Sequence, residues 1–286
     1  MANAMHNKNK LIRLVVLSIS LIFSQLSWAQ SFSDFYFFGD SLSDVGNNPE
    51  LGHKPYSDGA NWVQFFTKIF GQTVTYSDNG GNDYAYGGAQ TDTSSPGKAA
   101  GNRGLQSQAA VFLTQHQHLD PAALYVIWIG ANDVFNGILK QGKTPTDIAN
   151  QGANNITEVL VKLHDAGAKY LVLGNLTDLA ETPLGHTLSP QVQQVISSTA
   201  ALFNAKVLAA IKTVGFPVIT IDYYSLFNAI VRDPSHYGFT HSYTEQCIKH
   251  QNSICQEYIF WDNLHPTEAA YKIVADYTYK AVTAAD

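Results

Sequence analysis

The sequence predicts an α/β fold in which a mostly parallel sheet of five strands is covered by helices on both faces. Two observations indicate this fold class. Five short apolar runs alternate with longer stretches of helical spacing, and the short runs are continuously apolar. Such runs are typical of strands buried on both faces of a parallel sheet. A composition of 45% hydrophobic and 14% charged residues suits a well-packed globular domain.

The elements follow in chain order. The predicted strands are Phe35–Phe38, Thr73–Tyr76, Leu124–Ile129, Tyr170–Leu173 and Val218–Ile221. The predicted helices are Trp62–Phe70, Leu105–His116, Ile148–Ala166, Val192–Val214 and Glu268–Val282. Residues 233–258 show no sustained periodicity, which indicates either a lid or binding loop or a surface decoration. Because no repeat or composition break follows residue 30, we expect a single domain over residues 30–286.

The first 29 residues have the pattern of a secretory signal peptide. Lys8, Lys10 and Arg13 precede or enter an apolar run, and Ser27-Trp28-Ala29 has the small-x-small pattern of a signal peptidase site. The apolar run is too short and too interrupted for a membrane span of about 20 residues. We therefore expect an exported protein, secreted or periplasmic, that is cleaved near Ala29.

The charge balance argues against a nucleic-acid partner. Residues 1–29 hold three of the 17 Lys and Arg and no acidic residue, so the remaining chain has 14 against 23 Asp and Glu, a balance of −9. Nucleic-acid-binding proteins usually have the opposite sign. Attraction to anionic membranes by charge alone is also not expected, so any contact with lipid must rest on apolar side chains.

The two cysteines, Cys247 and Cys255, both fall in the exported part. An even count in an oxidising compartment favours a disulfide, with two free thiols as the alternative. Closing so short a loop would stabilise the fold by roughly 2–3 kcal/mol. The chain has no CxxC, HExxH or histidine-rich cluster, so we expect no metal and no cofactor.

A serine that could act as a nucleophile stands directly after the first predicted strand. Parallel sheets place their sites beyond the carboxyl ends of the strands, and Gly39 permits a tight turn before Ser41. Near the other end of the chain, Asp262 and His265 stand three residues apart. A carboxylate there could fix the imidazole tautomer so that its other nitrogen faces Ser41. Taken singly, these residues could also be turn and cap chemistry.

Acyl transfer also needs hydrogen-bond donors for the oxyanion that forms on the carbonyl oxygen. Gly88, in a Gly-Gly pair, offers a backbone N–H, and Asn132, after the third predicted strand, offers a side-chain amide. Asp133 is a poorer candidate because an ionised carboxylate has no proton to donate. Residues 137–144 match a phosphate-binding-loop pattern, but the strand and helix that this motif requires are not placed correctly around them.

Four blocks taken in order resemble the GDSL, or SGNH, hydrolase family. They are Gly-Asp-Ser-Leu around Ser41, Gly-Gly around Gly88, Gly-Ala-Asn-Asp around Asn132 and Asp-Asn-Leu-His around His265. The resemblance spans nearly the whole exported chain and implies a flavodoxin-like, three-layer α/β/α sandwich. It departs from the family at Asp83, where related sequences commonly have Asn.

The resemblance also implies a role for each residue. Ser41 would be the nucleophile and an oxyanion donor through its own N–H, with Gly88 and Asn132 as the other donors. His265 would be the general base and acid, and Asp262 would orient it.

The extended block around Ser41, the export signal and the late cysteine pair are similar to bacterial secreted lysophospholipases A and glycerophospholipid–cholesterol acyltransferases. This resemblance implies a serine lipolytic hydrolase that favours lysophospholipids and touches lipid aggregates or membranes transiently. The acyl group on Ser41 would pass to water or to an acceptor alcohol. Alternatives are a short-chain or aryl esterase, a carbohydrate deacetylase, and an inert secreted binding module. We expect the loop between Cys247 and Cys255 to shape or cover the acyl site.

Overall fold

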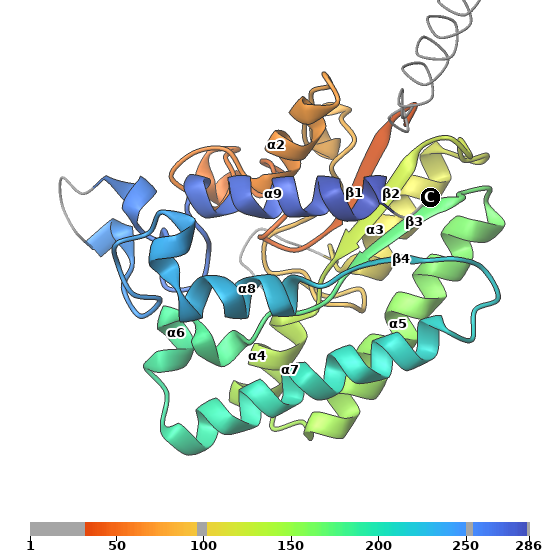
Figure 1. Ribbon diagram of the computed structural model, residues 1–286. Helices are drawn as coiled ribbons and strands as arrows, with labels where there is room; N and C mark the ends of the chain where they lie inside the picture. Colours follow the sequence, from red (N-terminus) through yellow and green to blue (C-terminus); the bar gives the residue numbers. More distant parts are fainter. Residues whose placement is uncertain (1–31, 96–101, 250–253, 285–286) are drawn as a thin grey trace, which may run out of the picture. The chain divides into compact units, whose positions relative to one another are not determined.

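Four parallel strands form the centre of the molecule (Figure 1). The computed structural model describes residues 32–95, 102–249 and 254–284, so the predicted signal peptide, residues 1–29, lies outside the described residues. The strands are β1 (Phe35–Gly39), β2 (Leu124–Trp128), β3 (Tyr170–Gly174) and β4 (Ile219–Ile221), and they pair in the order β1-β2-β3-β4. The predicted parallel α/β class is confirmed, with four strands instead of five.

The predicted strand Thr73–Tyr76 is wrong. Its pairing is limited to an isolated bridge between Tyr76 and Asp83, in which Asp83 N donates to Thr75 O at 3.1 Å. Residues 82–86 run beside β1 instead: Phe37 N donates to Asn82 O at 3.1 Å, and Tyr84 N donates to Phe37 O at 2.8 Å. Because these residues occupy the edge of β1, the segment before them cannot reach the sheet and is left outside it.

Helices cover both faces of the sheet, as predicted (Figure 1). Side chains alternate between the faces because successive strand residues point in opposite directions. Phe38 and Tyr125 pack against α3, α4, α5 and α7, whereas Phe37 and Val126 pack against α2, α8 and α9. The helices are α2 (Trp62–Ile69), α3 (Leu105–Gln115), α4 (Ala131–Leu139), α5 (Pro145–Asp165), α6 (Pro183–His186), α7 (Pro190–Ile211), α8 (Tyr223–Arg232) and α9 (Glu268–Thr283). The three-layer α/β/α sandwich is confirmed.

Several helices begin where side-chain caps satisfy their first N–H groups. Asn61 and Gln64 form a reciprocal capping box at the start of α2. The cap of α7 is Ser189, which is followed by Pro190 at the first helical position. The cap of α9 is Thr267, whose hydroxyl accepts from Ala270 N. The cap at Thr267, two residues after His265, fixes the start of α9 at Glu268.

Two of the helices that the sequence analysis missed border the site. In α8, Tyr223, Leu226 and Ile230 are buried at helical spacing after the cap residue Asp222. In α4, glycine and two asparagines lower the helix propensity, and tertiary packing decides the outcome. Because Gly137 lies inside α4, residues 137–144 do not form a phosphate-binding loop.

Among the described residues, α7 is the one helix long and apolar enough to cross a membrane by length and composition. Its Ile196, Ala200, Phe203 and Val207 are buried in the core beside α5. Packing inside the domain therefore accounts for its apolar character.

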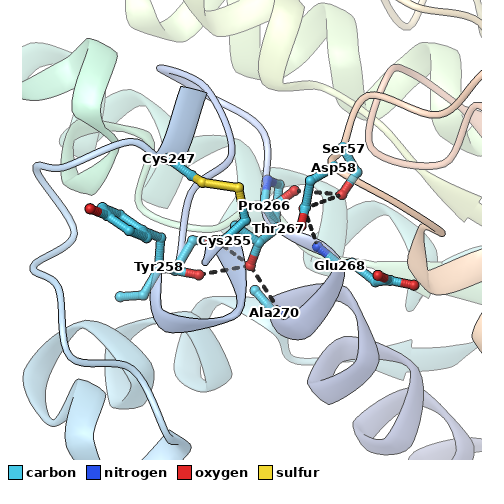
Figure 2. The surroundings of a disulfide bond; sticks show 10 residues. Ser57, Asp58, Cys247, Cys255, Tyr258, Pro266, Thr267, Glu268 and Ala270 are labelled. Atoms are coloured by element: carbon cyan, nitrogen blue, oxygen red, sulfur yellow. Dashed lines mark hydrogen bonds between the residues drawn. A yellow bond between two sulfur atoms is a disulfide. The ribbon is translucent and has the colours of Figure 1, made fainter. Parts of the chain in front are cut away.

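The described part of residues 233–258 contains only short 3-10 turns, in agreement with its irregular sequence. The turns are η4 (Pro234–Tyr237), η5 (Cys247–Lys249) and η6 (Cys255–Glu257). The predicted disulfide is present: Cys247 and Cys255 are bonded, with their Cα atoms 5.3 Å apart (Figure 2).

Candidate active site

The loop after β1 holds Ser41 at the carboxyl end of the sheet. Gly39 passes so close to β2 that a Cβ atom there would lie 2.3 Å from Trp128 O. The Asp40 side chain accepts from Leu42 N at 3.0 Å, and Asp40 O accepts from Asp44 N at the same distance. These bonds close a tight turn, which leaves Ser41 at its apex with 7% of its surface exposed.

Ser41, His265 and Asp262 form one hydrogen-bonded series, although 224 positions separate the serine from the histidine. His265 Nε2 lies 2.8 Å from Ser41 Oγ, and His265 Nδ1 lies 2.8 Å from Asp262 Oδ2. The histidine side chain is buried, so water competes little for either contact. With Nδ1 donating to the carboxylate, Nε2 is free to accept a proton from Ser41.

Asp262 also shapes the turn that carries the histidine. Its Oδ1 accepts from Leu264 N at 2.8 Å and from His265 N at 2.7 Å, while Oδ2 contacts the imidazole. Burial acts to raise the pKa of Asp262, but the contacts with His265 and the two backbone N–H groups lower it below its ordinary value. The carboxylate is therefore charged and is both the cap of the turn and the partner of the ring.

The predicted oxyanion donors lie at the same end of the sheet. Gly87 N donates to Asp44 Oδ2 at 2.9 Å, whereas within the described residues no carbonyl or carboxylate takes the N–H of Gly88. Gly88 has a φ of 81°, a conformation that favours glycine. Asn132 borders the same pocket as Ser41 and donates one amide hydrogen to Ala89 O at 3.0 Å, which leaves the second for a ligand.

Asp133 has a structural position. Both of its oxygens accept from Thr91 N, at 3.1 and 3.0 Å, and Oδ1 also accepts from the Thr91 hydroxyl at 2.6 Å. Burial raises the pKa of Asp133 to about 7. Its contacts fix the segment after Gly88 against the start of α4.

Comparison with known proteins shows the family of this chain. The family model of GDSL-like lipases and acylhydrolases matches residues 35–278. This range includes residues 40–47, here called the nucleophile loop, and residues 262–265, here called the acid–base turn. The chain belongs to this family.

Two relatives match most of this chain but only part of their own length. Lipase 1 of Photorhabdus luminescens is 29% identical over 71% of this chain and 30% of its own length. The thermolabile hemolysin of Vibrio parahaemolyticus is 25% identical over 83% of this chain and 61% of its own length. This chain therefore spans less than two thirds of either relative.

A solved structure supports the fold. The acetylxylan esterase Axe2 of Geobacillus stearothermophilus superposes with a TM-score of 0.53 over 89% of this chain and 96% of its own, at 15% identity. At this identity the likeness concerns the three-layer architecture alone.

The family's glycine block is tied to the nucleophile loop by buried carboxylates. Asp44 accepts from Gly46 N, Asn47 N, Asn48 N and Gly87 N, at 2.6 to 3.2 Å. Asp44 lies in the extended block around Ser41, but the sequence analysis gave it no role, since the partners of its carboxyl group include Gly87, 43 positions away.

Asp83, which departs from the family's common Asn, lies in the same cluster. It accepts from Val45 N at 2.7 Å and from Ala85 N at 3.1 Å. Burial raises the pKa of Asp83 well above its ordinary value, and the neighbouring Asp44 adds to the shift. The oxygens of Asp83 thus hold the glycine block against the nucleophile loop.

An apolar pocket adjoins Ser41 on the α8 and α9 side of the sheet. Its lining includes Leu42, Trp128, Leu226, Phe227, Ile230 and Phe260. Three of these side chains come from α8, which the sequence analysis missed, although the i, i+3, i+7 spacing in that helix would have indicated it.

The disulfide braces the segment that leads into the acid–base turn (Figure 2). Cys247 N donates to Phe260 O at 3.0 Å, and Ile248 N donates to Trp261 O at 2.9 Å. On the other side, the Thr267 hydroxyl donates to Tyr258 O at 2.7 Å. Cys247 and Ile248 are thus fixed to Phe260 and Trp261, of which Phe260 belongs to the pocket lining. The expectation that the loop between the cysteines shapes or covers the acyl site concerns residues 250–253, which lie outside the described residues.

Proposed function

We propose that this protein is a serine ester hydrolase that acts through an acyl-Ser41 intermediate. The observation that carries the proposal is the pair of 2.8 Å contacts from Ser41 Oγ to His265 and from His265 to Asp262. Ser41 Oγ bonds to the ester carbonyl carbon while its proton passes to His265 Nε2. The imidazolium then gives this proton to the leaving alkoxide as the C–O bond breaks.

The second half of the reaction uses the same groups in reverse. His265 removes a proton from water or from an acceptor alcohol, whose oxygen attacks the acyl carbon and releases Ser41. In both halves the oxyanion would accept from the N–H groups of Ser41 and Gly88 and from the Asn132 amide. Within the described residues, no carbonyl or carboxylate takes the N–H of Gly88 or the second amide hydrogen of Asn132, which supports these assignments.

The substrates that we propose are lysophospholipids. The apolar lining of the pocket beside Ser41 supports a substrate that places an apolar acyl group against it, because each buried methylene contributes about 0.8 kcal/mol. We further propose that the protein is exported, secreted or periplasmic, and that it meets lipid aggregates or membranes transiently through apolar contacts. The basis for export is the pattern of residues 1–29.

Fatty-acid release from a substrate panel tests this function. The panel contains lysophosphatidylcholine, a diacyl phosphatidylcholine and short-chain p-nitrophenyl esters, each with the purified protein and with Ser41→Ala. We expect release from the lysophospholipid, reduced at least about 10³-fold by the substitution because the nucleophile is lost.

The other outcomes separate the alternatives. Activity confined to short esters would replace the lysophospholipase proposal with a general esterase. Silence of both proteins on every substrate, while both remain folded, would contradict the enzyme proposal and favour a binding module. Addition of a long-chain alcohol, with detection of its ester, measures the acyltransferase share.

A further inference from the structure

Residues 55–60 form a strap that crosses the acid–base turn. The Ser57 hydroxyl donates to Pro266 O at 3.2 Å, and Asp58 Oδ1 accepts from Glu268 N at 2.8 Å (Figure 2). Ala60 N donates to the Glu268 carboxylate at 3.4 Å. The strap is therefore fastened to the residues that directly follow His265.

The strap presents one aromatic ring to the site, that of Tyr56. Its centroid lies 4.8 Å from that of the His265 ring, with 35° between the two planes. Its phenolic end lies against the glycine block, where a Cβ atom on Gly87 would be 2.0 Å from the Tyr56 oxygen. Asn48 donates a hydrogen bond to that oxygen. The hydrogen bond from Asn48 and the close approach to Gly87 thus hold the phenolic end in place, and the ring lies tilted beside the imidazole.

We propose that Tyr56 is a positioning residue whose ring stabilises the protonated form of His265. The inference rests on the proposed function for its catalytic meaning. When Ser41 attacks, its proton moves to Nε2 and the imidazole becomes a cation, which the negative face of an aromatic ring attracts within about 6 Å. Asp262 contacts the imidazole at Nδ1, and the Tyr56 ring lies 4.8 Å from the imidazole by centroid distance, so the carboxylate and the aromatic ring both act on the same cation.

Other titratable groups lie on the elements that form the site. Asp262 lies on its own turn, Asp40 and Asp44 lie in the loop after β1, and Tyr271 lies in α9 close enough to Asp40 and Asp262 to feel their charges. The strap adds Asp58, whose side chain accepts a hydrogen bond from Glu268 N. A change of the Tyr56 side chain alone leaves all these groups in the protein, so its effect on His265 reports the ring.

Titration of the His265 ring by NMR tests the proposal without any substrate. In Tyr56→Leu, which keeps apolar bulk but removes the ring, we expect the titration midpoint to fall by roughly half to one pH unit, since the cation loses its aromatic partner. Tyr56→Phe keeps the ring and should restore the midpoint. Tyr237→Leu, an equal change at a ring that meets His236 edge-on, is the matched control.

The kinetic readout is the acid limb of kcat/KM, which should move to lower pH by the same amount in Tyr56→Leu. An unshifted His265 midpoint in folded Tyr56→Leu would overturn the proposal. If that variant does not fold, phenylalanine is compared with pentafluorophenylalanine at position 56. The fluorinated ring keeps the shape of phenylalanine but removes the negative charge from the ring face, so the His265 midpoint should fall. A lower midpoint in a protein that cleaves no ester would support the contact between the rings and contradict the hydrolase.

Discussion

The Asp262 carboxylate divides two tasks between its two oxygens. Oδ1 takes the N–H groups of the turn, and Oδ2 takes the imidazole. Because both are acceptor positions, an amide cannot fill them both: its NH₂ group would face either two backbone donors or the ring N–H.

Asp262→Asn should therefore lower kcat by about 10³ to 10⁴-fold, since the imidazole would lose the partner that fixes its tautomer. KM should change little, because Asp262 is not part of the pocket lining. Steady-state kinetics on the best substrate of the panel measures both constants. Asp276→Asn, an exposed position on α9, is the matched control, and an unchanged kcat in Asp262→Asn would contradict the assigned orientation.

Among the elements, α8 connects the fold to substrate choice. It lies on the α2 and α9 side of the sheet and turns Leu226, Phe227 and Ile230 toward the pocket beside Ser41. A change on this helix should alter the preference for acyl length while the acid–base turn stays intact.

Leu226→Ala should lower kcat/KM on long-chain lysophospholipids roughly tenfold, because about two buried methylenes of contact are lost, and should leave short-chain esters nearly unchanged. The ratio of the two kcat/KM values is measured well below the unfolding temperature, since truncation of a buried leucine also costs about 2–5 kcal/mol of stability. Leu208→Ala, at a leucine of α7 that is 45% exposed, is the control. Equal losses on both substrate classes would remove α8 from the acyl site.

The elements that could be predicted are those whose local sequence pattern matches their burial in the folded protein. β2 is continuously apolar and buried, and α5 is long and periodic, so local pattern and tertiary burial agree. Thr73–Tyr76 also has residues that favour strands, yet residues 82–86 occupy the edge of β1 through long-range hydrogen bonds. The short segment at Tyr223–Arg232 was overlooked because its apolar residues merge with those of the preceding strand.

The site shows the same division. Ser41, Asp262 and His265 belong to recognisable blocks, and the fold brings them together. Tyr56 and Asp44 lie in loops without periodicity, and their positions depend on contacts with residues tens to hundreds of positions away. Such contacts are a property of the folded chain, so one sequence alone does not reveal them.

At the scale of the whole molecule, the end of the sheet that carries the site also buries four carboxyl groups, those of Asp40, Asp44, Asp83 and Asp133. Burial raises the pKa of each, to about 7 for Asp40 and Asp133. In the unfolded chain these groups would ionise near pH 4. Their contribution to stability is therefore full below about pH 4 and is lost as pH rises through the folded-state values.

The free energy of unfolding should consequently fall between about pH 4 and pH 7, where the unfolded chain has lost these protons and folded Asp40 and Asp133 still hold them. Urea denaturation at several pH values measures this slope. Asp133→Asn should flatten it, because one of the titrating groups is gone, whereas the exposed Asp276→Asn should leave it unchanged. A slope that is identical in both variants would show that Asp133 does not titrate in this range.

The bonds of Asp44 have a consequence for how the site tolerates change. One oxygen, Oδ2, accepts from both Asn48 N and Gly87 N, so two segments that lie 39 positions apart share a single anchor. A mutation that displaces this end of the sheet should therefore move the nucleophile loop and the glycine block together, in the same direction and by the same amount. The distance between the two segments is thus set by Asp44, so it stays constant when substitutions elsewhere in the chain shift both segments.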